Sequence, residues 1–219
     1  MYENDTSVKV CVSRHGGVLS RPLNLTIASS TGSASELKDF SKLLHTMAFS
    51  ESDGDRLCVS VTIIDDLLLE NDETFNLLLT STDSAVSVEL NMTSVTILDD
   101  DSVILALQPM EFTIAESSQQ VQITVVLRGR LEREVSLMLE SKDGTASFNK
   151  DYKMLSDKLT FPPSNSVTSS LTVNVTVIDD LLVEGMEYFT VYALAMDTAA
   201  HFIPGRNSTT IHIKDDDSK

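Results

Sequence analysis

Short stretches of alternating apolar and polar residues run along most of this chain. This period of two predicts β-strands, and the stretches are separated by loops rich in Ser, Asp, Gly and Asn. They lie at 8–13, 23–27, 59–63, 121–127, 135–139 and 171–178, with a longer apolar stretch at 103–115 that we expect to form one strand. Only 36–49 is a candidate for a short helix or turn. The pattern predicts an all-β fold built from immunoglobulin-like antiparallel β-sandwiches.

The chain contains an internal repeat. The segments VTIIDDLLLENDETF (61–75) and VTVIDDLLVEGMEYF (175–189) are identical at ten of fifteen positions. TGSASELKDF (31–40) parallels DGTASFNKDY (143–152), and ILDDD (97–101) parallels IKDDD (213–217). We therefore expect two tandem domains, 1–101 and 102–219. The first lacks its opening strand, because only two residues precede Glu3 whereas 103–115 precede the corresponding Glu116.

Charge narrows the range of functions. The 219 residues carry 33 acids against 16 bases, a net charge of −17, which argues against nucleic-acid binding. No apolar run approaches the roughly 18 residues of a membrane helix, and the first 30 residues lack a signal-peptide pattern. We expect either a cytoplasmic protein or a piece of a longer secreted or membrane protein. No nucleophile, base or cofactor motif is visible, so we do not expect an enzyme.

The acids are concentrated where predicted strands end. Asp65 and Asp66 follow one such strand, and Asp99 to Asp101 follow the last strand of the first copy. The second copy repeats both groups. Isolated acidic pairs of this kind are often only polar turns, and that alternative stays open here.

The ordered set G-T-A-x-x-x-x-D-Y, I-D-D-x-x-x-E-x-x-E-x-F and a terminal D-D-D resembles the Calx-beta domain. This is the calcium-binding β-sandwich of sodium–calcium exchangers and of extracellular matrix and adhesion proteins. The resemblance covers nearly the whole chain, twice. It departs at Asp39-Phe40, where D-F replaces D-Y, and at Glu3, whose preceding strand is missing.

The resemblance implies eight acidic calcium ligands in each copy. They are Glu3, Asp39, Asp65, Asp66, Glu70, Asp99, Asp100 and Asp101 in the first copy, and Glu116, Asp151, Asp179, Asp180, Glu184, Asp215, Asp216 and Asp217 in the second.

Calcium suits such a set because it takes six to eight oxygen ligands, often carboxylates. Two carboxylates 4 Å apart repel by about 4 kcal/mol at an effective dielectric constant near 20, and a bound cation relieves that repulsion. Zinc and copper fit less well, because the four His are scattered and the two Cys lie outside the acidic segments. A further alternative is that some of the sites are degenerate and bind calcium weakly.

N-x-S/T sequons point to export. They occur at Asn4, Asn24, Asn91, Asn174 and Asn207, although a Ser/Thr-rich β protein also acquires sequons by chance.

The two cysteines, Cys11 and Cys58, alternate out of phase with the apolar residues of their strands, and their counterparts in the second copy are Thr124 and Thr172. If their strands are neighbours, they can form a disulfide, which fits secretion; two free thiols are the alternative.

We therefore expect a calcium-binding tandem Calx-beta fragment of an extracellular or membrane-anchored protein, acting in cell adhesion, matrix assembly or cell communication. Calcium would stiffen the joint between the domains. Expected partners are calcium ions, neighbouring Calx-beta modules and matrix or cell-surface proteins, without membrane insertion by this segment. The alternatives are a cytoplasmic calcium-sensing segment of a transporter and a structural spacer that binds no metal.

Overall fold

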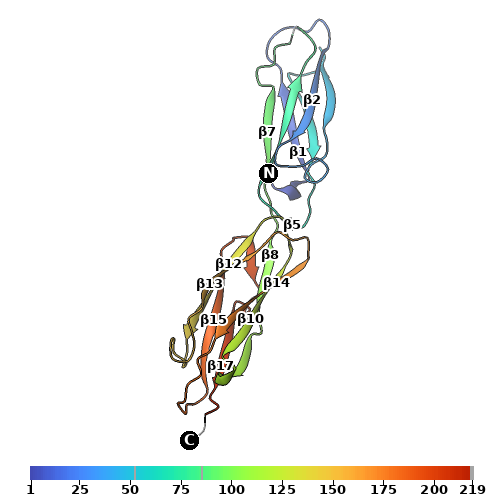
Figure 1. Cartoon of the computed structure of the whole chain (residues 1–219). Coiled ribbons are helices and arrows are strands. Elements are labelled where there is room, and N and C mark those ends of the chain that lie inside the picture. Colours follow the sequence, from blue (N-terminus) through green and yellow to red (C-terminus); the bar gives the residue numbers. More distant parts are fainter. Residues whose placement is uncertain (52, 85, 218–219) are drawn as a thin grey trace. The chain divides into compact units, whose positions relative to one another are not determined.

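The computed structural model describes residues 1–51, 53–84 and 86–217, which form two compact β units (Figure 1). The first unit comprises Met1–Asp66 and Asn71–Asp100. The second comprises Leu67–Glu70 together with the described residues from Asp101 on. The segment Leu67–Glu70 thus lies within the first repeat in sequence but belongs to the second unit in space.

The first unit consists of two antiparallel sheets, β1–β4 and β3–β2–β6–β7. Its elements are η1 (Glu3–Asp5), β1 (Ser7–Ser13), β2 (Leu23–Thr31), β3 (Leu44–Phe49), β4 (Arg56–Thr62), β6 (Glu73–Thr80) and β7 (Met92–Ile97). Val61 from one sheet and Ile27, Phe75 and Leu77 from the other share one buried core. The alternation of these strands places the apolar side chains between the two sheets.

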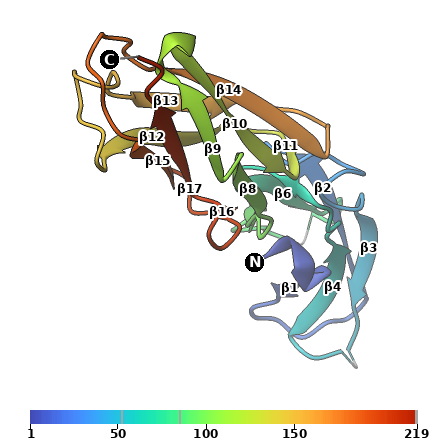
Figure 2. The same cartoon turned by 90° about the horizontal axis from the view of Figure 1, so that it is seen from below.

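The second unit has a four-stranded sheet, β14–β10–β8–β16, and a five-stranded sheet, β13–β12–β15–β17–β9. Figure 2 shows β9 alongside β17 and β10 alongside β14. The elements are β5 (Leu68–Leu69), β8 (Val103–Gln108), β9 (Glu111–Ala115), η2 (Glu116–Ser118), β10 (Gln120–Arg128), β11 (Arg130–Leu131), β12 (Val135–Asp143), β13 (Ser156–Phe161), β14 (Thr168–Thr176), β15 (Glu187–Ala195), β16 (Ala200–Phe202) and β17 (Ser208–Lys214).

Strand β10 shows why these sequences form sandwich strands. Val121, Ile123, Val125 and Leu127 are buried, whereas the residues between them are exposed or half-buried. Since successive side chains of a strand point to opposite faces, this sequence buries one face against the opposite sheet. The predicted all-β tandem sandwich, with the first unit lacking the opening strands β8 and β9 of the second, is confirmed.

One expectation about an individual element is wrong. The stretch 103–115 forms two strands instead of one, because Pro109 has no N–H and ends β8, and β9 then joins the other sheet. For the stretch 36–49, the expected alternatives are a short helix and a turn, and the structure has a turn followed by β3. Among the described residues, no helix is long and apolar enough to span a membrane.

The last leucine of the first D-D-L-L-L segment, Leu69, packs into the second unit, whereas Leu67 is 78% exposed. Strand β5 pairs in parallel with β11, with Leu69 opposite Leu131, and Leu69 is fully buried in the core of that unit. The Nε of Arg133 donates a hydrogen bond of 2.7 Å to the carbonyl oxygen of Glu70. Burial in this core therefore accounts for Leu69 of the apolar segment.

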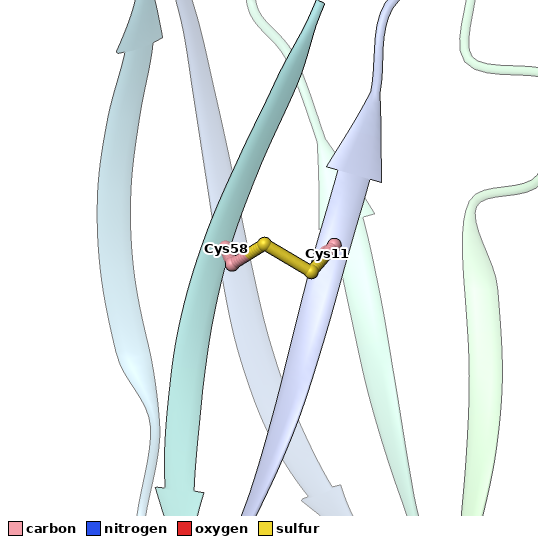
Figure 3. Close-up of a disulfide and its surroundings, with 2 residues drawn as sticks. All are labelled: Cys11 and Cys58. Carbon is pink, nitrogen blue, oxygen red and sulfur yellow. A yellow bond between two sulfur atoms is a disulfide. The ribbon is translucent and has the colours of Figure 1, made fainter.

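Cys11 on β1 and Cys58 on β4 stand opposite each other and are joined by a disulfide (Figure 3). Their strands are the two members of one sheet, and both side chains lie on the face that points away from the core. The disulfide therefore links the two strands without replacing any core side chain.

Candidate metal centre

The acids of the second unit gather around three chain segments at one end of the sandwich. Asp179 and Asp180 follow β14, the group 215–217 follows β17, and Glu116 begins η2 between β9 and β10. Strands β14 and β17 both end here, and the chain turns here between β9 and β10. The fold therefore brings together carboxylates that are up to about 100 positions apart in sequence.

Two triads at this end have ligand-compatible geometry. One carboxylate oxygen from each of Glu116, Asp180 and Asp217 lies within 4.8 Å of the others, and the same holds for Glu116, Asp179 and Asp216. Two oxygens bound to the same calcium ion at about 2.4 Å can be no more than about 4.8 Å apart. Each triad therefore meets the distance requirement for sharing one ion, and Glu116 belongs to both.

Glu116 is in an unfavourable position as an anion. Only 5% of its surface is exposed, and its Oε1 is buried without a hydrogen-bond partner among the described residues. Desolvation, followed by repulsion from Asp215, Asp217 and other nearby aspartates, raises its pKa from 4.5 to about 7. A bound cation would remove the repulsion that opposes ionisation of this side chain.

Asp217, another member of the first triad, is in a similar position. Its Oδ2 is buried and also has no hydrogen-bond partner in the described part of the chain. Desolvation and the neighbouring carboxylates, Asp215 first, raise its pKa. Two unpartnered carboxylate oxygens thus converge on one small region, which is unusual because buried polar atoms normally have a partner.

Backbone and hydroxyl donors hold the remaining carboxylates in place. The amide N–H of Glu184 donates to Asp215 Oδ2 at 2.7 Å, and that of Asp217 donates to Asp215 Oδ1 at 2.8 Å. The hydroxyl of Ser117 donates to Asp216 at 2.5 Å. These contacts preorganise the loop without supplying a countercharge.

A second acidic group lies beside the triads, formed by Asp151, Glu184 and Glu187. Desolvation and Asp151, through both charge and a hydrogen bond, raise the pKa of Glu187 to about 7. Desolvation and Asp151 also raise the pKa of Glu184, with Lys150 opposing the effect. Sequence reasoning did not include Glu187 among the ligands, although it is the second glutamate of the repeated E-x-x-E.

In the first unit, Glu3, Asp65 and Asp100 form a triad within the same 4.8 Å limit. Glu3 is 5% exposed, and its amide N–H donates to the carbonyl oxygen of Leu98 at 3.1 Å. Tyr2 forms a parallel bridge with Leu98, as Ala115 pairs with Lys214 in the second unit. Glu3 is thus held in place by a single bridge, whereas Glu116 is positioned by the whole of β9.

The acidic ends of the two units share the same backbone hydrogen bonds. The N–H of Ile63 donates to Thr6 O, and that of Val177 donates to Gln119 O; Thr6 and Gln119 both have left-handed backbone conformations, with φ of 62° and 60°. The N–H of Ser35 donates to the Asp39 carboxylate at 2.5 Å, as that of Ser147 donates to Asp151 at 2.6 Å. The repeat therefore conserves hydrogen bonds that orient the acids as well as the acids themselves.

In the first copy, Phe40 replaces the tyrosine of the D-Y pair, and the residue that would accept its hydrogen bond differs as well. Phe40 stacks on Phe75 with ring centroids 4.2 Å apart, as Tyr152 stacks on Phe189 at 4.0 Å. The Tyr152 hydroxyl donates a hydrogen bond to Asp143, whose counterpart in the first copy is Thr31. Because the phenol and its acceptor are both absent, the change leaves no buried polar group in need of a partner.

The structure also places the remaining predicted residues. Asp99 is half-buried, and its N–H donates to Asp72 at 3.3 Å. Asp66 is exposed and is the last residue of the first unit before the segment Leu67–Glu70. Glu70 ends that segment, which belongs to the second unit. Asp101 is the first residue of the remaining part of the second unit. The five sequon asparagines are all exposed, and they are Asn4, Asn24, Asn91, Asn174 and Asn207.

The chemistry of the second-unit cluster fits calcium. Its donors are carboxylates, with no His or Cys in the triads, and hard cations prefer such oxygen ligands. The buried, unpartnered oxygens of Glu116 and Asp217 provide binding capacity that protein donors do not fill.

Comparison with known proteins shows the family to which this chain belongs. The Calx-beta domain model matches residues 1–101 and 99–217. The sodium/calcium exchanger Calx of Drosophila melanogaster is 31% identical over 90 residues, 41% of this chain and 9% of that protein. FRAS1-related extracellular matrix protein 2 of Homo sapiens is 25% identical over 205 residues, 87% of this chain and 6% of that protein. Extracellular matrix protein 3 of Lytechinus variegatus is 30% identical over 174 residues, 73% of this chain and 6% of that protein. The chain thus spans less than a tenth of each of these relatives.

Solved structures of Calx domains are also similar. The apo-form CBD1 domain of Calx is 26% identical, with a TM-score of 0.49 over 53% of this chain and 100% of that chain. The two-domain CBD12 of CALX1.2 is 22% identical, with a TM-score of 0.44 over 97% of this chain and 94% of that chain.

Proposed function

Because this chain belongs to the Calx-beta domain family, we propose that it is a calcium-binding tandem module of an extracellular or membrane-anchored protein, acting in cell adhesion, matrix assembly or cell communication. One observation carries the calcium proposal. Glu116 and Asp217 present buried carboxylate oxygens without partners, surrounded by further aspartates. A binding module, and not an enzyme, is the role that such a site supports.

In the second unit, the proposed ligands come from the two triads and from the neighbouring acidic group. They are Glu116, Asp151, Asp179, Asp180, Glu184, Glu187, Asp215, Asp216 and Asp217. Bound calcium would supply the positive charge that lets these side chains ionise together. In the first unit, Glu3, Asp65 and Asp100 form the core of the corresponding proposal, with the other acids of the repeat contributing.

Calorimetric titration with calcium tests this function. We expect heat of binding and a higher melting temperature for the wild-type chain at millimolar calcium, the range of extracellular modules. Asp179→Asn/Asp180→Asn should abolish the response of the second unit. The matched control is Glu140→Gln/Asp157→Asn, which removes the same charge at exposed positions of β12 and β13 and should leave the response intact. A wild-type chain without binding heat or melting shift would establish the spacer alternative.

Two features favour an extracellular location: the exposed sequons and the disulfide between Cys11 and Cys58. Two of the relatives are named as extracellular matrix proteins, while a third is named as a sodium/calcium exchanger. The competing proposal is therefore a cytoplasmic calcium sensor in a transporter. Occupied glycans would exclude the sensor, whereas unmodified sequons together with submicromolar calcium affinity would favour it.

We further propose that calcium restricts bending between the domains. Strand β7 ends at Ile97 and β8 begins at Val103, so the short connection carries Asp99, Asp100 and Asp101. Neutralising these charges would lower the repulsion that a short acidic connection experiences. Small-angle X-ray scattering should then give a narrower size distribution with calcium than with chelator. Identical distributions in the two conditions would disprove the stiffening mechanism.

A further inference from the structure

Strand β15 of the second unit exposes large apolar side chains on the sheet face that points away from the core. Tyr188, Tyr192 and Leu194, which we call the β15 stripe, are 41%, 45% and 70% exposed, whereas Phe189 and Ala193 on the opposite face are buried. Since β15 lies between β12 and β17 (Figure 2), the stripe runs along the middle of the sheet and not along an edge. Contiguous exposed apolar surface of this kind marks interaction sites in soluble proteins.

The first unit has smaller side chains at the corresponding positions. Its strand β6 is the counterpart of β15 in the repeat. Thr74 stands in place of Tyr188, and Thr80 stands in place of Leu194. Because both units form the same sandwich, folding does not require large apolar side chains at these exposed positions. Their presence in the second unit therefore indicates binding.

The immediate flanks of the stripe carry balanced charge. On one flank, β12 contributes the exposed residues Glu140 and Lys142, and neither forms an ion pair within the described part of the chain. On the other flank, β17 contributes Ser208, Thr210 and His212. The whole chain, by contrast, has 33 acids against 16 bases. A second copy of the chain can therefore approach this face without the repulsion expected from a net charge of −17.

We propose that the β15 stripe and its flanks bind the same surface of a second copy of the chain, forming a symmetric dimer. A two-fold axis that lies in the interface, runs perpendicular to β15 and crosses it at Val191 brings Tyr188 of each copy onto Leu194 of the other. The reason is that both residues lie three positions from Val191. In such an isologous interface every contact occurs twice. This inference does not depend on the calcium proposal.

The same axis pairs opposite charges. Lys142 lies opposite Thr190, and Glu140 lies opposite Tyr192, so the two charged residues also stand on either side of the axis. Glu140 of each copy therefore meets Lys142 of the other, which gives two ion pairs beside the apolar contact. Complementary charges of this kind fix the orientation of two partners more than they add affinity.

The acidic end of the sandwich decides between two symmetric arrangements. Glu187 and the acidic group around it lie next to Tyr188, about 20 Å from Leu194 at about 3.3 Å per residue. An axis parallel to the strands would stack the acidic ends of the two copies about 10 Å apart, the spacing of packed sheets. The perpendicular axis places them at opposite ends of the dimer, well beyond the roughly 8 Å over which physiological salt screens charges.

The area of the face predicts a weak dimer. Five strands about 4.8 Å apart, each contributing about seven residues of about 3.3 Å, cover on the order of 550 Å². Stable complexes bury about 800 Å² on each partner, and transient ones bury less. We therefore expect a dissociation constant on the order of 100 μM.

Sedimentation equilibrium of the full chain, at micromolar to millimolar concentrations in chelator and in calcium, tests this proposal. We expect a monomer–dimer equilibrium in both conditions. Leu194→Asp should raise the dissociation constant at least about tenfold, because it introduces a charge into both apolar contacts. The matched control is Thr80→Asp, which adds the same charge at the corresponding position of β6 and should leave the dissociation constant unchanged. Both positions are exposed, and melting curves check that each variant is folded.

Charge exchange tests the orientation. Glu140→Lys and Lys142→Glu should each weaken the dimer at least about threefold, because like charges then meet twice. The double variant Glu140→Lys/Lys142→Glu restores opposite charges and should return the dissociation constant to within about twofold of the wild type. A chain that stays monomeric at millimolar concentration would overturn the proposal. Dimerisation of Leu194→Asp at wild-type strength, or a double variant no stronger than the single variants, would overturn it as well.

Discussion

Replacing Glu116 by Gln gives the sharpest test of the electrostatics of the second unit. Folding raises the pKa of Glu116 from 4.5 to about 7, first through desolvation and then through the neighbouring aspartates. At 1.36 kcal/mol for each tenfold change, this corresponds to an upper limit of about 3 kcal/mol by which ionisation of this buried side chain opposes folding without calcium. The amide of Gln keeps the shape of the side chain and removes that charge.

The sign of the effect depends on pH. Because the pKa is higher in the folded state, the destabilisation is absent below pH 4.5, grows between pH 4.5 and 7, and is complete above pH 7. In chelator at pH 8, Glu116→Gln should therefore melt at a higher temperature than the wild type, by up to on the order of 10 °C for a unit of this size. At pH 4.5 the two proteins should melt within about 1 °C of each other on the same grounds.

Calcium should reverse this order. A ligand at 100 times its dissociation constant stabilises the folded state by about 2.7 kcal/mol, and the variant loses a proposed ligand from both triads. Calorimetric melting of the wild type, Glu116→Gln and the exposed control Glu134→Gln, each in chelator and in excess calcium, measures both effects. If Glu116→Gln is less stable than the wild type in chelator at pH 8, or responds fully to calcium, the reasoning is wrong.

Three further predictions concern features outside the acidic triads. Cys11→Ala/Cys58→Ala should lower the stability of the first unit by about 4 kcal/mol, since the bond closes a loop with a sequence separation of 47 residues; reductant should remove the difference in calorimetric melting. Asp197→Asn should destabilise the second unit by about 2 kcal/mol at pH 7, because it breaks the half-buried pair with Arg133. Since that pair lowers the pKa of Asp197, melting curves should converge as the pH falls through its folded-state pKa, below 3.8; a gap that persists there would contradict the assignment. Secretion from eukaryotic cells should attach a glycan at exposed Asn174, and intact-mass spectra should lose it in Asn174→Gln; an unmodified wild type would contradict export.

The strands were the most predictable part of the structure. Burial on one face requires alternation, so 121–127 could be assigned from its sequence alone, and β10 follows it almost residue for residue. The stretch 103–115 was harder, because both halves are apolar and extended. Periodicity does not reveal that the chain changes sheets at Pro109. The sheet partner of a strand depends on contacts distant in sequence, which a local pattern does not contain.

The leucines after Asp66 show a different limit of sequence reasoning. Leu68 and Leu69 form a two-residue strand, too short for any periodicity, and the core that buries Leu69 comes from residues beyond Asp101. Their counterparts Leu182 and Val183 are 61% and 48% exposed. The same sequence motif thus has one buried and one exposed occurrence. The burial of these residues is decided by the segments that pack against them and not by the motif.

The acidic residues also differ in how far the sequence alone predicts them. The predicted ligand set is what the resemblance to the Calx-beta domain implies, and it does not include Glu187, because a charged residue at the start of a strand has a simple structural explanation. What identifies Glu187 is its hydrogen bond with Asp151 and its raised pKa, both of which require the fold. The equivalent glutamate of the first copy is Glu73, so the E-x-x-E spacing was a usable signal in the sequence.

The two copies also show which parts of such a site tolerate change. The first unit reaches its Glu3 triad with one bridge at Leu98 in place of the whole of β9, and with Phe40 in place of the tyrosine. Its backbone hydrogen bonds around the acids nevertheless match those of the second unit. The frame that orients carboxylates is therefore local, built from turns and strand ends, whereas completion of the sheets is a separate requirement. This separation explains how a unit whose smaller sheet consists of β1 and β4 can still assemble an acidic triad.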